Sequence, residues 1–137
     1  MSRTQSLSYK DAGVNIPKLD RFKSGIAKAI HRTYGAEVLS KIGGFGGLFQ
    51  FDKAQYRDPV LVSSVDGVGT KLKVAKIMRR HNTVGIDIVS HCAIDIVVQG
   101  ARPLFFLDYI GKGLLDHIVG DQIIEGLVEG CLIAKCE

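Results

Sequence analysis

Residues 63–71 bring a carboxylate, two glycines, a threonine and a lysine together in the order Ser-Ser-Val-Asp-Gly-Val-Gly-Thr-Lys. The apolar run of residues 59–65 is typical of a strand, so Asp66 would follow the end of that strand. A carboxylate there can bind Mg²⁺, and glycine lets the backbone approach a ligand closely. The motif therefore suits a metal–phosphate group. An ordinary turn with a solvated Asp66 and Lys71 explains the local pattern equally well.

A second set of polar side chains, Asp87, His91 and Asp95, recurs every four residues within an apolar helical pattern. That spacing places the three side chains along one stripe of a helix. Such a stripe could place one or two carboxylates beside a metal ion. For His91 we favour a simpler interpretation, an exposed polar face on which the imidazole pairs with its acidic neighbours.

Two further stretches could contact a ligand. Residues 43–51 read Gly-Gly-Phe-Gly-Gly-Leu-Phe-Gln-Phe, a run that could wrap a phosphate with backbone amides or form a bulged strand. The run is neither a dinucleotide fingerprint, because Phe49 replaces the third glycine, nor a P-loop. Residues 104–110 are a continuous apolar run typical of a buried strand. Asp108 lies near its carboxyl end, the edge at which ligands gather in open α/β sheets.

The elements that must position these residues follow from periodicity and from helix-end signals. We predict helices over residues 17–33, with Pro17 at the first position, and over 83–99, with Thr83 as N-cap and Gly100 as the stop. Asp116 is expected to cap a last helix. Residues 72–78 suit a strand or a short helix. One α/β (α+β) domain over residues 15–137, preceded by a flexible polar arm over residues 1–14, is the predicted organisation.

Bulk composition excludes several classes of protein. The chain has 137 residues, 46% of them hydrophobic and 23% charged, enough for one domain with a core. No apolar stretch approaches the length of a bilayer span, and residues 1–11 are polar, without the apolar segment of a signal peptide. A net charge of +4 without an aromatic-lined basic stripe argues against nucleic-acid binding. Cysteines at 92, 131 and 136 lack a zinc pattern. Helical apolar patterns around Cys92 and Cys131 predict buried thiols, and we expect a reducing cytoplasm.

Taken in order, the motifs resemble the N-terminal half of the aminoimidazole ribonucleotide synthetase family, also called phosphoribosylformylglycinamidine cyclo-ligases. Asp-Gly-Val-Gly-Thr-Lys followed by Pro-Leu-Phe-Phe-Leu-Asp-Tyr is the most specific part of that resemblance. Ile94 and His91 depart from the family pattern, which commonly has Asn and Met at those places. The segments that carry the resemblance are residues 8–14, 43–49, 59–63, 66–71, 81–87, 97–101, 103–109 and 129–131.

The resemblance implies a small mixed sheet with helices on one face, whose sheets join into a barrel across a homodimer. It also implies ATP-dependent closure of the imidazole ring of formylglycinamidine ribonucleotide, supported by Mg²⁺. Asp66 and Asp95 would bind the metal. ATP phosphates would be wrapped by the backbone of Gly43, Gly44, Phe45, Gly46 and Gly47 and of Gly67, Val68 and Gly69. Thr70 and Lys71 would support the phosphates, Asp87 would contact the nucleotide or its ligands, and Asp108 is a weaker candidate.

The family has a second domain that these 137 residues do not contain, so we expect the chain to be an N-terminal portion. Two alternatives stay open. One is a truncated dimerisation module without turnover. The other is an ATP-using sibling such as a selenophosphate synthetase or a thiamine-phosphate kinase. The resemblance assigns no proton acceptor for ring closure.

Overall fold

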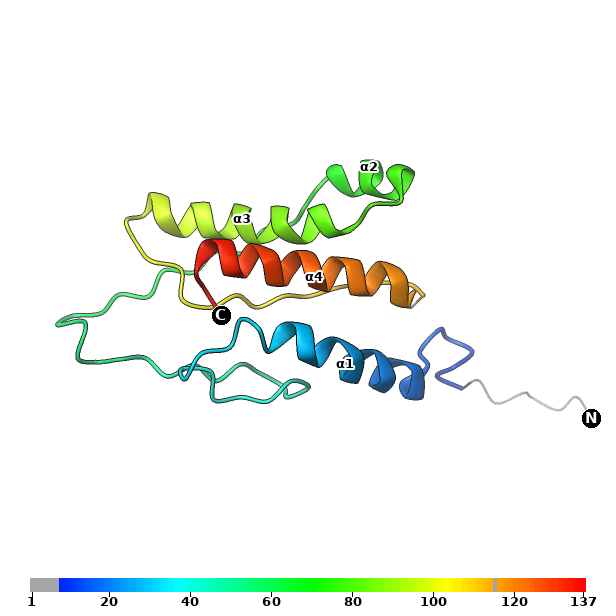
Figure 1. Cartoon of the computed structure of the whole chain (residues 1–137), viewed down its shortest axis with the longest axis horizontal. Helices are drawn as coiled ribbons and strands as arrows, with labels where there is room; N and C mark the ends of the chain where they lie inside the picture. Colours follow the sequence, from blue (N-terminus) through cyan, green and yellow to red (C-terminus); the bar gives the residue numbers. More distant parts are fainter. Residues whose placement is uncertain (1–7, 115) are drawn as a thin grey trace, which may run out of the picture.

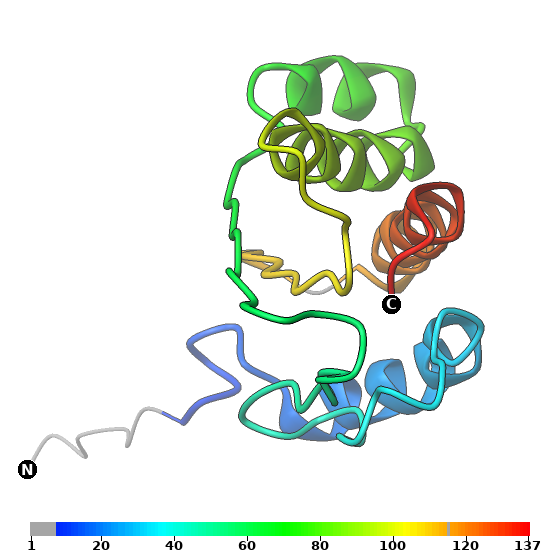
Figure 2. The same cartoon turned by 90° about the vertical axis from the view of Figure 1, so that its left-hand side faces the viewer.

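The computed structural model describes residues 8–114 and 116–137, in which four helices are joined by extended segments and loops (Figure 1). The helices are α1 (Ile16–Ile30), α2 (Lys71–Met78), α3 (Asn82–Val98) and α4 (His117–Ala134). Figures 1 and 2 show α4 between α3 and α1, so α4 is the central helix of the layer. None of the helices in these ranges is long and apolar enough to cross a membrane.

The ends of α1 and α4 follow from capping residues. Asn15 Oδ1 accepts a hydrogen bond from the Lys18 amide at 3.1 Å, and Pro17 lies in the first turn of α1. α1 ends at Ile30, three residues before the predicted end, although isolated turns continue to Tyr34. Asp116 Oδ1 accepts from the Val119 amide at 3.2 Å, which confirms the predicted cap of α4.

The structure resolves the ambiguous segment as helix α2 and corrects the start of α3. α3 begins at Asn82, so the predicted N-cap at Thr83 is wrong; His81 stands before the helix without a side-chain cap bond. The backbone amide of His81 donates to Gln122 Oε1 on α4 at 2.9 Å, a tertiary contact that local sequence signals do not reveal. The stop at Gly100 is confirmed: its φ is +76°, and its amide donates to the Val97 carbonyl at 2.8 Å.

Glycines allow α3 and α4 to pack closely. A Cβ atom at Gly85 would collide with the backbone of α4, and one at Gly126 would collide with the backbone carbonyl of Asn82. Farther along the same contact, a Cβ at Gly130 would lie 2.8 Å from Val89 Cβ. The absence of side chains at these positions lets the two helix backbones approach each other, because ridges and grooves are shallow there.

The hydrophobic core lies where α4 meets its two neighbours. Val89 of α3 is only 1% exposed, the most buried side chain of the core. α1 contributes Ile26, and the ring of Phe22 covers α4 at Gly120. The other buried members of this cluster all follow Gly120 in the chain: Ile124, Leu127, Val128, Cys131 and Cys136. All three cysteines are free and buried, as predicted for Cys92 and Cys131.

The predicted mixed sheet is not formed within residues 8–114 and 116–137. Residues 59–65 and 104–110 run extended in Figures 1 and 2, but no ladder of hydrogen bonds joins them. The pairing that exists is short: an antiparallel bridge links Val38 and Phe49, and Glu137 exchanges backbone hydrogen bonds with Leu104 and Phe106 at 3.0 and 2.6 Å. A sheet needs neighbouring strands bonded along their length, and the two extended segments do not pair with each other.

The expected N-terminal arm is only partly described. Residues 1–7 lie outside the described range. Residues 8–14 form a hydrogen-bonded turn, in which the Val14 amide donates to the Tyr9 carbonyl at 2.8 Å. This turn leads directly into the capped start of α1.

Candidate functional site

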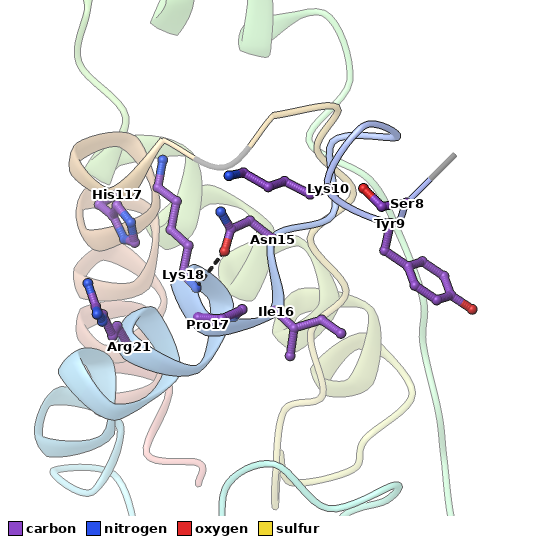
Figure 3. A pocket seen from close by; sticks show the side chains of 9 residues that line it. All are labelled: Ser8, Tyr9, Lys10, Asn15, Ile16, Pro17, Lys18, Arg21 and His117. Atoms are coloured by element: carbon purple, nitrogen blue, oxygen red, sulfur yellow. Dashed lines mark hydrogen bonds between the residues drawn. The ribbon is translucent and has the colours of Figure 1, made fainter. Parts of the chain in front are cut away.

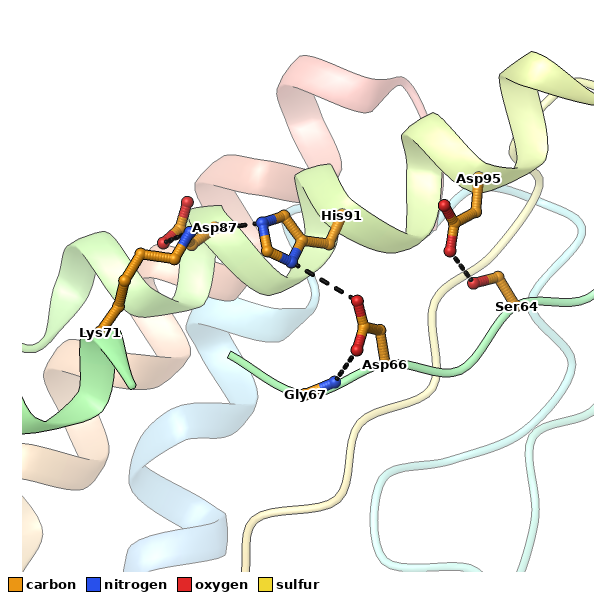
Figure 4. A network of polar contacts seen from close by, with 7 residues as sticks. All are labelled: Ser64, Asp66, Gly67, Lys71, Asp87, His91 and Asp95. Atoms are coloured by element: carbon orange, nitrogen blue, oxygen red, sulfur yellow. Dashed lines mark hydrogen bonds and ion pairs between the residues drawn. The ribbon is translucent and has the colours of Figure 1, made fainter. Parts of the chain in front are cut away.

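The motif of residues 63–71 lies along the polar stripe of α3 (Figure 4). Four contacts join them: Ser64 meets Asp95, Asp66 meets His91, and Lys71 meets both Asp87 and His91. Residue numbers rise along the motif while those of its partners on α3 fall, so the segment runs antiparallel to the helix. The spacing that predicted a stripe on α3 is therefore confirmed, and the stripe is the surface on which the motif rests.

Lys71 forms the shortest contact of this set. Its Nζ lies 2.6 Å from Asp87 Oδ2 and 3.3 Å from His91 Nε2. Lys71 is also the first residue of α2, so the helix fixes its backbone while two groups on α3 hold its ammonium. About half of the Lys71 side chain is exposed, and this leaves the ammonium within reach of a ligand.

His91 joins the carboxylate and the lysine of the motif. Its Nδ1 lies 3.6 Å from Asp66 Oδ2, and its Nε2 faces Lys71. Because Lys71 can only donate, Nε2 must accept, which places the ring hydrogen on Nδ1 toward Asp66. The neutral tautomer with Nδ1–H thus suits both neighbours. The favoured interpretation of His91 is wrong in its partners: the ring pairs with Asp66 and Lys71 of the motif, not with the acids of its own helix.

Asp66 on the extended segment and Asp95 on the stripe present carboxylates at separate points of the contact with α3. Asp66 Oδ1 accepts from the amide of Gly67 at 2.7 Å, and its side chain is half exposed. Asp95 Oδ2 accepts from Ser64 Oγ at 2.8 Å. Asp95 also lines a shallow hollow with residues 61–64, Val98 and Gln99.

The donor set fits Mg²⁺, because carboxylate oxygens are hard ligands and Mg²⁺ usually takes one or two of them beside phosphates and water. Within the described part of the chain, no three groups among His, Cys, Asp and Glu lie close enough to enclose an ion by themselves. A site of this kind would depend on phosphate oxygens to complete the coordination of the metal.

The remaining candidates lie apart from the stripe. The loop of Gly43–Gly47 is on the side of α1 in Figures 1 and 2, away from α2 and α3, and Leu107 packs against Gly47. Asp108 stands on the extended segment after α3, where desolvation by its surroundings raises the pKa of its carboxyl. The structure thus brings Asp66, Lys71, Asp87 and Asp95 to one helix, and it does not bring the glycine loop to them.

A larger cavity lies elsewhere, between the start of α1 and the start of α4 (Figure 3). Lys10, Lys18, Arg21 and His117 give it a basic lining, and Figure 3 shows the Tyr9 ring directed away from the other side chains. None of the site residues predicted from the sequence lines this cavity. The candidate site is therefore the stripe of α3 together with the motif that rests on it.

Sequence reasoning missed Ser64 and the contacts of His91. The serine stands two residues before Asp66, and alternation along an extended segment puts both side chains on one face. That face meets the stripe of α3, whose four-residue spacing was visible in the sequence. Matching the two periodicities would have paired Ser64 with Asp95 and Asp66 with His91.

Comparisons with known proteins agree with the order of the motifs. Residues 51–137 match the family model described as AIR synthase related protein, N-terminal domain. Proteins named phosphoribosylformylglycinamidine cyclo-ligase are similar to nearly the whole chain. The one from Trichlorobacter lovleyi is 54% identical over 129 residues, which cover 94% of this chain and 37% of that protein. The one from an Anaeromyxobacter species is 53% identical over 131 residues, which cover 96% and 38%.

A third relative of the same name, from Syntrophus aciditrophicus, is 54% identical over 134 residues, which cover 98% of this chain and 38% of that protein. The chain thus spans 37% to 38% of the length of these three relatives. The family match covers α2, α3, α4 and the whole motif that rests on α3. The chain belongs to the family of AIR synthase related proteins, as a member of its N-terminal domain.

Proposed function

We propose that this chain is the ATP-binding portion of a cyclo-ligase that closes the imidazole ring of formylglycinamidine ribonucleotide, giving 5-aminoimidazole ribonucleotide, ADP and phosphate in purine biosynthesis in the cytoplasm. The observation that carries the proposal is that Lys71 at the start of α2 and Asp66 on the extended segment both lie against the stripe of α3 that bears Asp95. Partly exposed charges of both signs, held against one helix, suit the polyphosphate of a nucleotide and its cation.

The proposed chemistry requires positioning and charge neutralisation more than covalent help from the protein. The γ-phosphoryl group of ATP would pass to the formyl oxygen of the substrate. An amidine nitrogen would then attack the same carbon, and phosphate would leave as the ring closes. Lys71 would neutralise phosphate charge, and the backbone amides of Gly67, Val68 and Gly69, supported by Thr70, would orient the polyphosphate. Mg²⁺ bound to Asp66 and Asp95 would supply further charge neutralisation.

Asp87 would position Lys71, and His91 would position both Lys71 and Asp66. Asp87 holds the lysine ammonium at 2.6 Å, so it would fix the cation in place for the phosphates. The glycine loop of residues 43–47 and Asp108 would reach the nucleotide only through a rearrangement of the segments that carry them, because they lie away from the stripe.

A homodimer is part of the proposal. Along the extended segments, Val60, Val65 and Tyr109 are 84%, 96% and 94% exposed. Apolar side chains on unpaired backbone favour association with another strand. A second copy that pairs these segments would complete the mixed sheet and the barrel that the resemblance implies. The same exposed surface favours the second candidate function, a dimerisation module that does not turn over.

Titration calorimetry with ATP and Mg²⁺ tests the nucleotide site. We expect the 137-residue chain to bind Mg·ATP, and Asp66→Asn and Lys71→Met to abolish binding. Asp20→Asn is the matched control, because it removes the same charge on α1 and should leave binding unchanged. Unchanged affinity in Asp66→Asn would overturn the metal assignment. No binding by the wild-type chain, with a dimer mass of twice 14.9 kDa in solution, would favour the dimerisation module.

A further inference from the structure

Two cysteines meet where α4 ends. Lys135 adopts a left-handed conformation with φ +54°, and the chain then turns back over the helix. The Cys136 amide donates to the Cys131 carbonyl at 3.0 Å, and the Lys135 amide donates to Leu132 at 3.4 Å. These two bonds define a Schellman motif, which is frequently accompanied by a side-chain contact between the residues at the Cys131 and Cys136 positions.

Both side chains of that contact are thiols. Cys131 and Cys136 are each 6% exposed and belong to the same buried cluster as Val89 and Val128. The backbone of Glu137 is paired with Leu104 and Phe106, so the residue after Cys136 is also held. The buried end of α4 and the paired backbone of Glu137 therefore hold the two cysteines in place.

The two thiols differ in acidity because they interact. A hydrogen bond from the Cys131 thiol to the Cys136 sulfur lowers the pKa of Cys136. The same bond raises the pKa of Cys131, and burial and the nearby charge of Asp108 raise it further. Cys136 is therefore the better nucleophile of the pair, and Cys131 lies beside it.

We propose that Cys131 and Cys136 are a reversible oxidation site, which a low-molecular-weight disulfide such as glutathione disulfide converts to an intrachain disulfide bond. The Cys136 thiolate attacks one sulfur of the small disulfide, forms a mixed disulfide and releases one small thiol. Cys131, deprotonated, then attacks the Cys136 sulfur and displaces the second small thiol. The protein loses two protons and two electrons, and the small disulfide is reduced to two thiols.

Access to the buried pair comes from local opening of the last turn of α4. A non-glycine residue in the left-handed region, here Lys135, costs conformational energy, and terminal turns open more readily than a core. Closing the disulfide would hold that turn shut. Its reduction by excess thiol would restore the starting state, as expected of a regulatory disulfide in a reducing compartment.

Cys92 provides the internal control. It is 8% exposed and lies on α3, outside the cluster that contains the other two cysteines. If burial alone decided which thiols are oxidised, all three would react. If the contact within the Schellman motif decides it, Cys92 stays reduced.

The test exposes the folded 137-residue chain to glutathione disulfide, quenches with acid and alkylates the remaining thiols. We expect loss of two alkylatable thiols, a mass lower by about 2 Da, and a peptide that links Cys131 to Cys136. Excess dithiothreitol should restore all three thiols. Hydrogen exchange at the amides of Cys136 and Glu137 should slow in the oxidised form.

Variants separate the two steps. Cys92→Ser should form the disulfide as the wild type does, and Cys131→Ser should accumulate the mixed disulfide at Cys136. Linkage through Cys92, linkage between two chains, or three thiols still open to alkylation would each overturn the proposal. The wild-type peptide map decides the question even if a cysteine variant folds poorly.

Discussion

Gly126→Ala tests whether the approach of α3 and α4 depends on the missing side chain. The new Cβ would overlap the carbonyl of Asn82, lie 2.8 Å from its carbonyl carbon, and lie 3.1 Å from the Gly85 Cα. All of these atoms are backbone, so relief requires the helices to move apart. Overpacking of this kind costs about 3 kcal/mol, whereas alanine gains about 1 kcal/mol of helix propensity over glycine.

The expected net effect is a loss of about 2 kcal/mol in the free energy of unfolding, or about 8 °C in melting temperature for a chain of this size. Urea unfolding followed by far-ultraviolet circular dichroism measures the first quantity, and a thermal scan measures the second.

Gly25→Ala is the matched control, because a Cβ at this helical position meets nothing within 4 Å. It should stabilise the chain by about 1 kcal/mol through propensity alone. If Gly126→Ala melts at or above the wild-type temperature, the close backbone packing of α3 on α4 does not exist in solution. If Gly25→Ala also fails to stabilise the chain, the assumed gain in helix propensity from alanine is wrong instead.

Three further substitutions test the caps and the carboxyl groups. Asp116→Ala should lower the free energy of unfolding by about 1 kcal/mol, because the amide of Val119 loses its acceptor; urea unfolding measures it. The pKa of Asp108 is raised above its ordinary value of 3.8. The unfolded chain therefore loses this proton at a lower pH than the folded chain, and stability falls as pH rises above 3.8. Asp108→Asn should flatten that fall between pH 4 and 7, and an unchanged slope would contradict the assignment. The pKa of Glu137 is also raised, above its ordinary value of 4.5, because its Oε2 is buried without a partner and Glu37 lies beside it. Ionisation of Glu137 should therefore lower stability as pH rises above 4.5. Glu137→Gln should raise the melting temperature at pH 7 more than at pH 4.

The helices could be predicted because their signals are local. Pro17 and Asp116 mark helix starts, and Gly100 marks an end, since each needs only its own neighbours. Thr83 misled because Gln122, on another helix, supplies a partner at the start of α3. The character of residues 72–78 was undecided because a short segment of mixed periodicity suits either structure.

The residues of the candidate site could be named from the sequence, but their pairings could not. Asp66, Lys71, Asp87 and Asp95 were named because their residue types suit a phosphate and its cation. The contact of His91 with Asp66 and Lys71 depends on how an extended segment crosses a helix, which no local rule gives. The pairing of strands was harder still to predict, because hydrogen bonds between strands depend on a partner distant in the sequence.

The antiparallel contacts of the motif with α3 also select their own register. If the segment slid by one helical turn toward the start of α3, Asp66 would face Asp87. If it slid by one turn the other way, Asp66 would face Asp95. Either shift would place two carboxylates side by side and remove Lys71 from Asp87, so misalignment is penalised by repulsion as well as by lost attraction.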